Sequence, residues 1–271
     1  MKKIAATIVV VLLLARLGMD HYTGHFPEDF NVRNLENGRI IALGHGGMGT
    51  RSWHDLNTEP SFTKAKEKGA DGTEMDAQLT ADGALVAFHD ERVGEAKCPN
   101  HVSQHTYAAL KACDRGLMKV EDVLALDWKA GSIFSLDVKL HGADSAHQAL
   151  MVQRIAGLKA SFPQFRILVE STLLDFLLLA KANGCADGLY LYAADADAGL
   201  SACVAHGLAG ISIRSELITA LQVEACHAQG IRVMLWGVGT RWDNHQAALK
   251  SPDLIQTDKL APLIELVSNV R

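Results

Sequence analysis

The sequence predicts an α/β fold, a (β/α)8 TIM barrel with a small insertion after the second strand. Short β-rich runs alternate with helical stretches from residue 38 onward, a pattern typical of a parallel sheet with helices outside it. About eight such repeats fit the length of a closed barrel of roughly 250 residues. An open, doubly wound sheet is the alternative.

Strands and helices are expected in alternation along most of the chain. The β-rich runs cover 39–43, 72–78, 84–88, 132–138, 166–169, 188–192, 210–213, 232–237 and 254–256. The helical patterns cover 60–68, 145–161, 173–183, 199–206, 216–229, 244–250 and 260–269. Several of these helices end at a glycine, as at Gly184, Gly207 and Gly230, which is typical of left-handed helix caps.

One stretch interrupts this alternation. Residues 80–83, TADG, are a strong hairpin signal between the second and third β-rich runs. Residues 96–117 then match neither pattern, and with their flanks they are expected to form an inserted lobe at about 92–118. Because no Pro/Ser-rich linker divides the chain, residues 38–271 are expected to form one barrel domain.

The N-terminus has the pattern of a secretory signal. Lys2 and Lys3 precede an apolar run at 4–15, which Arg16 follows. The run is shorter than the ~20 residues that a spanning helix needs. Residues 1–20 are therefore predicted to be a signal peptide or an uncleaved signal anchor, with a buried helix as the alternative. The protein is then expected to be exported, and to be periplasmic or anchored to the outer face of the inner membrane.

Export would permit disulfide bonds, because the receiving compartment is oxidising. Cys98 and Cys113, 15 residues apart in a polar stretch, are the first candidate pair, and Cys185 and Cys203 are a second. The alternative is that all five cysteines are small buried residues. No CxxC or Cys/His ligand spacing appears in the sequence, so a zinc site is not expected.

The composition excludes other classes of protein. A chain that is 48% hydrophobic is too apolar to be disordered. A formal net charge of -5 argues against a protein that binds nucleic acid through a basic surface. No nucleic-acid partner is therefore expected.

Ionisable residues gather where predicted strands end, and in a parallel barrel these ends form the site face. Glu74 and Asp76 lie two residues apart in one strand, so both side chains face the same side. Asp137 and Lys139 repeat that spacing in a later strand. Three carboxylates in one cavity repel one another unless a cation lies between them, and oxygen ligands suit Ca²⁺ or Mg²⁺ better than a soft metal.

Two histidines are expected at the same cavity. His45 follows the first strand, and His89 follows the third β-rich run. Two imidazoles that titrate near neutral pH can serve as base and acid in phosphodiester cleavage, while a cation and Lys139 attract the phosphate. Each residue alone also has an ordinary structural interpretation. Their joint placement at strand ends favours the catalytic one.

Residues 69–90, which read GADGTEMDAQLTADGALVAFHD, resemble the central signature of the glycerophosphodiester phosphodiesterases. The resemblance extends over about 39–262 and includes DLIQTD at 253–258. It implies an eightfold βα barrel with an insertion after the second strand.

The resemblance also implies roles for individual residues. It makes His45 and His89 the acid/base pair, and it makes Glu74, Asp76 and Asp137 the ligands of one divalent cation, Ca²⁺ or Mg²⁺. It further implies that Lys139 contacts the phosphate, that Trp236 packs against the glycerol and that Asn57 contacts the metal or phosphate site. Plain barrel core is the alternative for Trp236.

The sequence departs from the family's pattern at four positions. Gly46 stands where the family usually has an arginine directly after the first histidine. Arg51 in the same loop is the first candidate to replace this phosphate ligand, and Arg214 and Arg241 are others. The remaining departures are Asp137 in place of a glutamate, Leu56 where the family often has a glutamate, and Gly237 in place of a threonine.

The expected activity is metal-dependent hydrolysis of glycerophosphodiesters to glycerol phosphate and an alcohol. The expected partner is a small phosphodiester, with membrane anchoring through the N-terminal segment. Phospholipase-D-like activity on lysophospholipids or sphingolipids is one alternative, and a non-catalytic glycerophosphodiester-binding protein is another. The head group, the choice of metal and the attacking group stay open.

Overall fold

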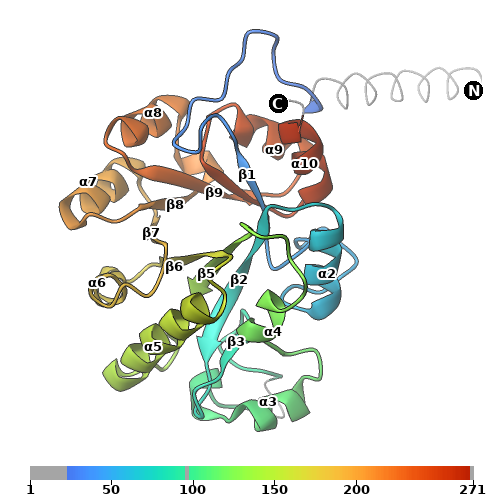
Figure 1. The fold of residues 1–271 in the computed structure, drawn as a ribbon, viewed down its shortest axis with the longest axis vertical. Coiled ribbons are helices and arrows are strands. Elements are labelled where there is room, and N and C mark those ends of the chain that lie inside the picture. Colours follow the sequence, from blue (N-terminus) through green and yellow to red (C-terminus); the bar gives the residue numbers. More distant parts are fainter. Residues whose placement is uncertain (1–22, 95–97, 269–271) are drawn as a thin grey trace, which may run out of the picture.

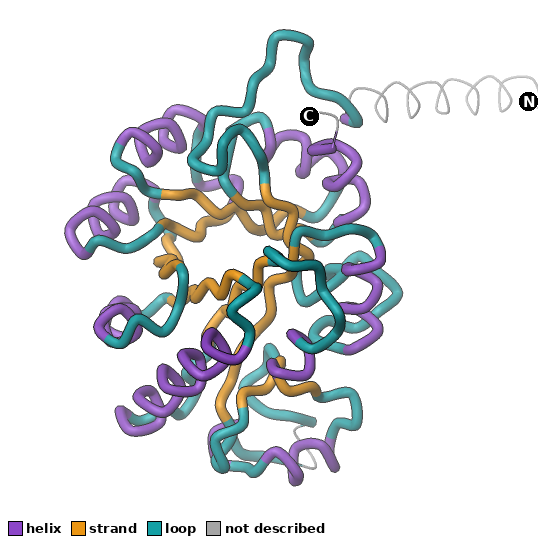
Figure 2. Tube along the Cα trace, viewed as in Figure 1, coloured by secondary structure: helices purple, strands orange, loops and turns teal. Residues whose placement is uncertain are grey.

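The computed structural model, which describes residues 23–94 and 98–268, contains a closed barrel of parallel strands with helices around it (Figures 1 and 2). The strand β1 pairs with β10 on one side and with β2 on the other, so the sheet has no open edge in the barrel. This closure excludes the open doubly wound sheet. The eight barrel strands are β1 (Ile41–Gly44), β2 (Gly72–Leu79), β5 (Ile133–Val138), β6 (Arg166–Ser171), β7 (Gly188–Ala193), β8 (Gly210–Arg214), β9 (Arg232–Val238) and β10 (Leu254–Thr257).

The helices cover the outside of the barrel (Figure 2). They bury apolar side chains at helical spacing, as α5 does with Met151, Val152, Ile155 and Leu158. They are α2 (Glu59–Glu67), α4 (Val120–Leu124), α5 (Ser145–Ser161), α6 (Leu174–Ala182), α7 (Ala196–His206), α8 (Ala220–Ala228), α9 (Arg241–Ala248) and α10 (Leu260–Ser268).

The start of α8 differs from the prediction by four residues. The stretch predicted as the first turn of that helix contains instead the 3-10 turn η2 (Ser215–Leu217). Thr219 then caps α8, because its hydroxyl accepts from the Gln222 backbone N–H while the Gln222 side chain accepts from the Thr219 backbone N–H. This reciprocal cap starts the helix later in the chain.

The insertion follows β2, as the sequence predicts. The strand β3 (Leu85–Ala87) pairs antiparallel with β2, and the short β4 (Met118–Lys119) pairs antiparallel with β3. Between β3 and β4 lie the 3-10 turn η1 (Val102–Gln104) and the helix α3 (Tyr107–Cys113), which the sequence did not predict. The lobe has its own small apolar core, built from Val86, Val93, Cys98, Val102, Leu110 and Leu117.

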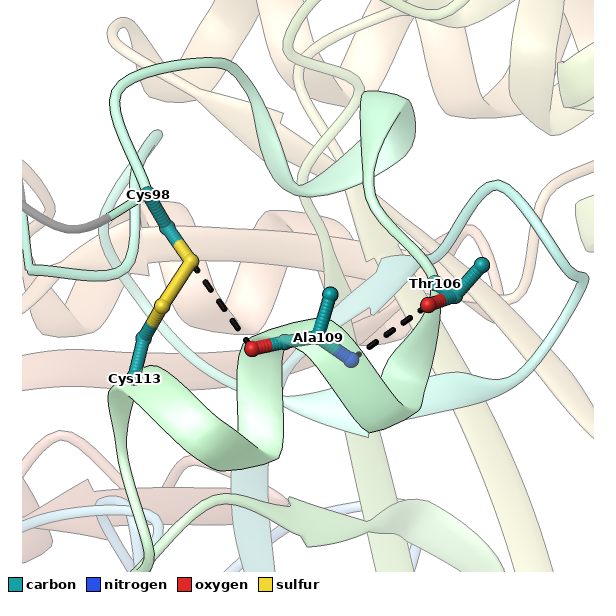
Figure 3. The surroundings of a disulfide bond; sticks show 4 residues. All are labelled: Cys98, Thr106, Ala109 and Cys113. Carbon is teal, nitrogen blue, oxygen red and sulfur yellow. Dashed lines mark hydrogen bonds between the residues drawn. A yellow bond between two sulfur atoms is a disulfide. The ribbon is translucent and has the colours of Figure 1, made fainter.

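A disulfide bond between Cys98 and Cys113 closes this lobe, as predicted (Figure 3). Thr106 caps α3 by accepting from the Ala109 backbone N–H at 3.3 Å, so the bridge holds the helix at its far end.

The predicted Cys185–Cys203 bridge is wrong. Cys185, Cys203 and Cys226 are free thiols buried between the helices and the barrel. They behave as small apolar residues, and burial raises the pKa of each thiol to about 11.

The barrel interior is packed with side chains, so the site lies above this packing at the carboxyl ends of the strands. The interior cluster is formed by Ile41, Leu43, Ile133, Leu168, Tyr190, Met234 and Leu254. In the described part of the chain no helix is long and apolar enough to cross a membrane. The predicted signal segment, residues 1–20, lies outside the described residues.

Candidate active site

A cavity of about 260 Å³ opens at the carboxyl end of the barrel. It receives side chains from residues that are up to 213 positions apart in the sequence, as His45 and Asp258 are. Its lining is His45, Glu74, Asp76, His89, Asp137, Lys139, Tyr192, Trp236, Gly237, Val238, Gln256 and Asp258.

Three carboxylates share this cavity. Glu74 and Asp76 project from β2 and Asp137 from β5, where Asp76 and Asp137 are direct neighbours in the sheet. One oxygen from each of the three lies within 4.8 Å of the other two. Burial, and then repulsion from Asp76, raise the pKa of Glu74 well above its usual range. Hard oxygen ligands at this spacing, which repel one another, fit a divalent cation.

Lys139 neutralises part of this negative charge. Its Nζ lies 2.6 Å from Asp137 Oδ2 and 3.2 Å from Asp76 Oδ1. Although burial acts in the opposite direction, the charges of Asp137 and Asp76 raise the pKa of Lys139 above its usual value. Lys139 therefore stays charged and bridges two of the three carboxylates.

Asn57 fixes the orientation of Asp76. Its Nδ2 donates to Asp76 Oδ2 at 2.8 Å, which leaves Oδ1 to face Lys139. The backbone of Asn57 has a φ of 59°, a left-handed conformation that asparagine tolerates better than most residues. Asn57 thus contacts the carboxylate cluster.

Gly46 cannot be replaced by arginine without moving this loop. Its φ is +49°, and a Cβ built on it would lie 2.9 Å from the Leu56 Cβ. Its backbone N–H donates to Glu74 Oε2 at 3.0 Å. Gly46 and Leu56, two of the positions that depart from the family's pattern, therefore lie against each other. Because Gly46 has no side chain, its backbone N–H comes close enough to donate to Glu74.

Each of the two histidines is held by a carboxylate at Nδ1. His45 Nδ1 lies 2.8 Å from Asp258 Oδ1, and His89 Nδ1 lies 2.8 Å from Asp90 Oδ1. His89 is the more exposed side chain, at 61%, and stands at the root of the insertion after β3. In both cases Nε2 is the nitrogen left to exchange a proton with a bound molecule.

One wall of the cavity is aromatic. The Tyr192 and Trp236 rings lie 4.8 Å apart between centroids, and Trp236 Nε1 is buried with no hydrogen-bond partner among the described residues. The Arg214 guanidinium carbon lies 5.0 Å from the Trp236 ring centroid. Such a cation–π contact positions a charged group beside the cavity.

The other two candidate arginines lie elsewhere. Arg51 is exposed in the loop after β1 and is not among the residues that line the cavity. Arg241 pairs with Glu265 at 2.5 Å, on the outer helices. Of the three arginines proposed from the sequence, the structure brings only Arg214 against a residue that lines the cavity.

Several residues of the site were missed by the sequence analysis as functional residues. Tyr192, Gln256 and Asp258 line the cavity, and Glu170 lies buried beside Asp137 in the sheet. A carboxylate directly after the apolar run at 167–169 was the available signal for Glu170. Gln256 and Asp258 lie in the stretch DLIQTD at 253–258, whose resemblance to the family was the available signal for them, and no local pattern was available for Tyr192.

The chain matches the model of the glycerophosphoryl diester phosphodiesterase family over residues 45–261. The chain belongs to this family. The match runs from His45 through all three carboxylates to α10, so it includes the whole described site.

Individual curated proteins match shorter parts of the chain. It is 28% identical to the uncharacterized protein YqiK of Bacillus subtilis, over 45% of this chain and 55% of that protein. It is 44% identical to a glycerophosphodiester phosphodiesterase of Caldanaerobacter subterraneus, over 22% of this chain and 26% of that one. The chain thus spans about half or less of the length of the curated relatives it matches.

Solved structures of the family show the same fold. A glycerophosphodiester phosphodiesterase from Parabacteroides distasonis superposes with a TM-score of 0.69 at 19% identity, covering 85% of this chain and 97% of that one. A phosphodiesterase from Oleispira antarctica, solved in complex with the product sn-glycerol-3-phosphate, gives 0.69 at 15% identity, over 83% and 95%.

Proposed function

We propose that this protein hydrolyses glycerophosphodiesters to glycerol phosphate and an alcohol, with the help of one divalent cation, Ca²⁺ or Mg²⁺. The observation that carries the proposal is the convergence of three carboxylates, one lysine and two histidines on a single cavity. Membership of the glycerophosphoryl diester phosphodiesterase family supports it, as does the product bound in the Oleispira antarctica relative.

Glu74, Asp76 and Asp137 would hold the cation, because their oxygens lie within 4.8 Å of one another and repel without it. When bound, the cation would add positive charge beside the phosphate oxygens. Lys139 adds a second positive charge at the same place. The charge that develops on the phosphate would therefore be offset from two directions.

His45 and His89 would move the protons. One Nε2 takes the proton from the attacking hydroxyl as its oxygen bonds to phosphorus, and the other gives a proton to the alcohol oxygen as the second P–O bond breaks. Asp258 and Asp90 hold the two rings through Nδ1, so neither ring has to reorient during the reaction.

Trp236 would pack against the glycerol moiety, with Tyr192 behind it in the aromatic wall. Gly46 has no side chain to bind the phosphodiester, as the family's usual arginine would. We assign this role to Arg214 and not to Arg51. Arg214 is paired only with the exposed Glu216, at 3.0 Å, and such a surface pair exchanges easily for an anionic ligand.

The test is release of glycerol phosphate from glycerophosphocholine by the full chain, with Ca²⁺ or Mg²⁺ and then with a chelator. We expect turnover only with the cation, and loss of at least about 10²-fold in His45→Ala, His89→Ala and Glu74→Gln. His206→Ala, at the end of α7 and away from the cavity, is the matched control. Undiminished turnover in either cavity histidine variant contradicts the assigned roles. Release of choline and lysophosphatidic acid from lysophosphatidylcholine measures phospholipase-D-like activity.

We also propose that the protein is exported, and that residues 1–20 are a signal peptide or an anchor at the outer face of the inner membrane. The Cys98–Cys113 disulfide supports this, because such bonds persist in oxidising compartments. Cell fractionation with N-terminal sequencing tests it. Reduced protein retained in the cytoplasm contradicts it.

A further inference from the structure

Six large apolar side chains of the described residues are at least 44% exposed: Trp53, Leu173, Val204, Leu217, Leu221 and Trp242. Single exposed apolar residues are normal on a soluble protein. What sets this group apart is its position in the barrel, because all of its members except Val204 come from one end.

The topology fixes this position. Trp53 lies in the segment between β1 and α2, and Leu173 is the cap residue that begins α6. Leu217 ends η2 after β8, and Leu221 and Trp242 are the second residues of α8 and α9. In an all-parallel barrel the segments after strands and the starts of the helices lie at the carboxyl end of the strands, where the cavity opens.

Val204 is the one of these six exposed side chains that lies at the other end of the barrel, so it serves as a control. It is 48% exposed, like Leu173, but it lies in the last turn of α7 (Ala196–His206). The last turns of the helices lie at the opposite end of the barrel. The exposed tryptophan and leucine side chains thus lie at the end of the barrel where the cavity opens, after β1, β6, β8 and β9.

Two of the arginines beside this rim are paired, Arg214 with Glu216 and Arg241 with Glu265. The formal net charge of the chain is -5, which would repel a strongly anionic surface. Both observations favour a zwitterionic lipid surface over a strongly anionic one. Tryptophan and leucine are also the side chains that enter the boundary between lipid head groups and acyl chains.

We propose that this rim, formed by Trp53, Leu173, Leu217, Leu221 and Trp242, docks the cavity mouth onto a zwitterionic phospholipid layer. The inference rests on the proposed function in one respect, that the cavity is where a phosphodiester is cleaved. A protein docked on this rim would close the mouth, whereas a lipid layer presents phosphodiester head groups to it. The substrates would then include phosphodiesters that still carry an acyl chain, in addition to soluble glycerophosphodiesters.

The path of the chain fits this orientation. Phe26 stacks on His245 of α9, with ring centroids 6.3 Å apart, and the Trp242 ring lies 6.3 Å from His245. The described chain therefore begins beside a helix whose first turn carries part of the rim. The apolar run at 4–15 precedes Thr23 by eight residues, a reach of at most roughly 28 Å.

The test places the full chain on phosphatidylcholine vesicles that carry bromine in the acyl chains, which quench only tryptophan that enters the lipid. We expect quenching in the wild type, and in the Val204→Ser control, but clearly less in Trp53→Phe. This readout does not depend on turnover or on whether residues 1–20 also bind lipid. Equal quenching in wild type and Trp53→Phe overturns the proposal.

A second measurement compares two substrates. The double variant Trp53→Ser/Leu221→Ser should lose about tenfold of its turnover on lysophosphatidylcholine micelles, with glycerophosphocholine turnover as the reference. Micellar turnover equal to that of Val204→Ser overturns the docking role. If neither the wild type nor any variant turned over either substrate, the proposed function would be wrong. The quenching experiment would still test the docking, because it does not depend on turnover. If the protein self-associated through the rim and showed no quenching, the rim would be a protein–protein contact, and the proposal would be overturned.

Discussion

His45 Nδ1 lies 2.8 Å from Asp258 Oδ1, and this contact joins the ends of β1 and β10. Asp258 also accepts the Thr50 backbone N–H at 2.8 Å, so the carboxylate cannot rotate away from the ring. Burial alone would lower the pKa of His45, but the hydrogen bond to Asp258, with the charges of Glu74 and Asp258, raises it to about 9. The last strand of the barrel thereby sets the charge and the orientation of a residue on the first.

Asp258→Asn should therefore lower the pKa of His45 toward its ordinary value of 6.5 in metal-free protein. A histidine whose pKa is raised by folding stabilises the fold below about pH 6.5, and loses that contribution as the pH rises through about 9. The variant should be less stable by roughly 1–2 kcal/mol near pH 6, since a third of the imidazole is exposed, and the difference should shrink above about pH 9. Histidine NMR titration and urea unfolding measure both effects. Asp55→Asn, in the same loop, is the control, and a pH-independent difference would refute the argument.

Gly46→Arg, which restores the usual family residue, should destabilise this protein by roughly 2 kcal/mol and should not raise its turnover. The left-handed φ and the Leu56 Cβ at 2.9 Å cause this cost. Gly46→Ala carries the backbone strain, about 1 kcal/mol, and the Cβ contact, but not the bulk of the arginine. A glutamate at position 56 keeps the Cβ, but it removes the Leu56 Cδ2 contact at 3.1 Å and can pair with the new arginine, so Gly46→Arg/Leu56→Glu should recover stability beyond the sum of the single changes. Strict additivity in urea unfolding would show that the two positions act independently.

Arg214→Lys should raise KM for glycerophosphocholine about tenfold and leave kcat nearly unchanged. Lysine keeps the charge but loses the planar fork that grips a phosphodiester and stacks on Trp236, a difference of about 1–2 kcal/mol. Uniform binding of substrate and transition state appears in KM and not in kcat. Arg241→Lys, whose arginine pairs with Glu265, is the matched control. A kcat effect without a KM effect would argue that Arg214 acts on the chemical step.

The sequence predicted those residues of the site whose placement follows from the alternation of side chains along a single strand. Glu74 and Asp76, and Asp137 and Lys139, face one cavity because strand residues two apart share a face. The boundaries of the barrel strands were predicted to within two residues, since each strand is a short apolar run bounded by turn residues.

The missed parts depend on closure of the barrel. Tyr192, Gln256 and Asp258 reach the cavity only because β7 and β10 close the same ring as β2, and no local pattern reports that contact. The helix α3 was missed because it is seven residues long and is held by a cap and a disulfide.

Glu170 offers a test of the buried charge beneath the site. Its side chain is fully buried, Oε1 accepts from Ser135 Oγ at 2.5 Å and from Gln256 Nε2, and Oε2 has no partner among the described residues. Burial, and then the charge of Asp137, raise its pKa to about 7 from an ordinary 4.5. The unfolded chain thus releases this proton at lower pH than the folded chain, and stability falls as the pH rises through about 7.

Glu170→Gln keeps the shape and the Oε1 acceptor but cannot ionise. In metal-free protein it should be more stable than the wild type by roughly 2–3 kcal/mol near pH 9, and should show no gain near pH 4.5. Urea unfolding at both pH values measures the difference, and Glu216→Gln, on an exposed carboxylate, is the control. If the gain were the same at both pH values, it would come from packing, and the carboxyl group of Glu170 would not be the source of the pH dependence.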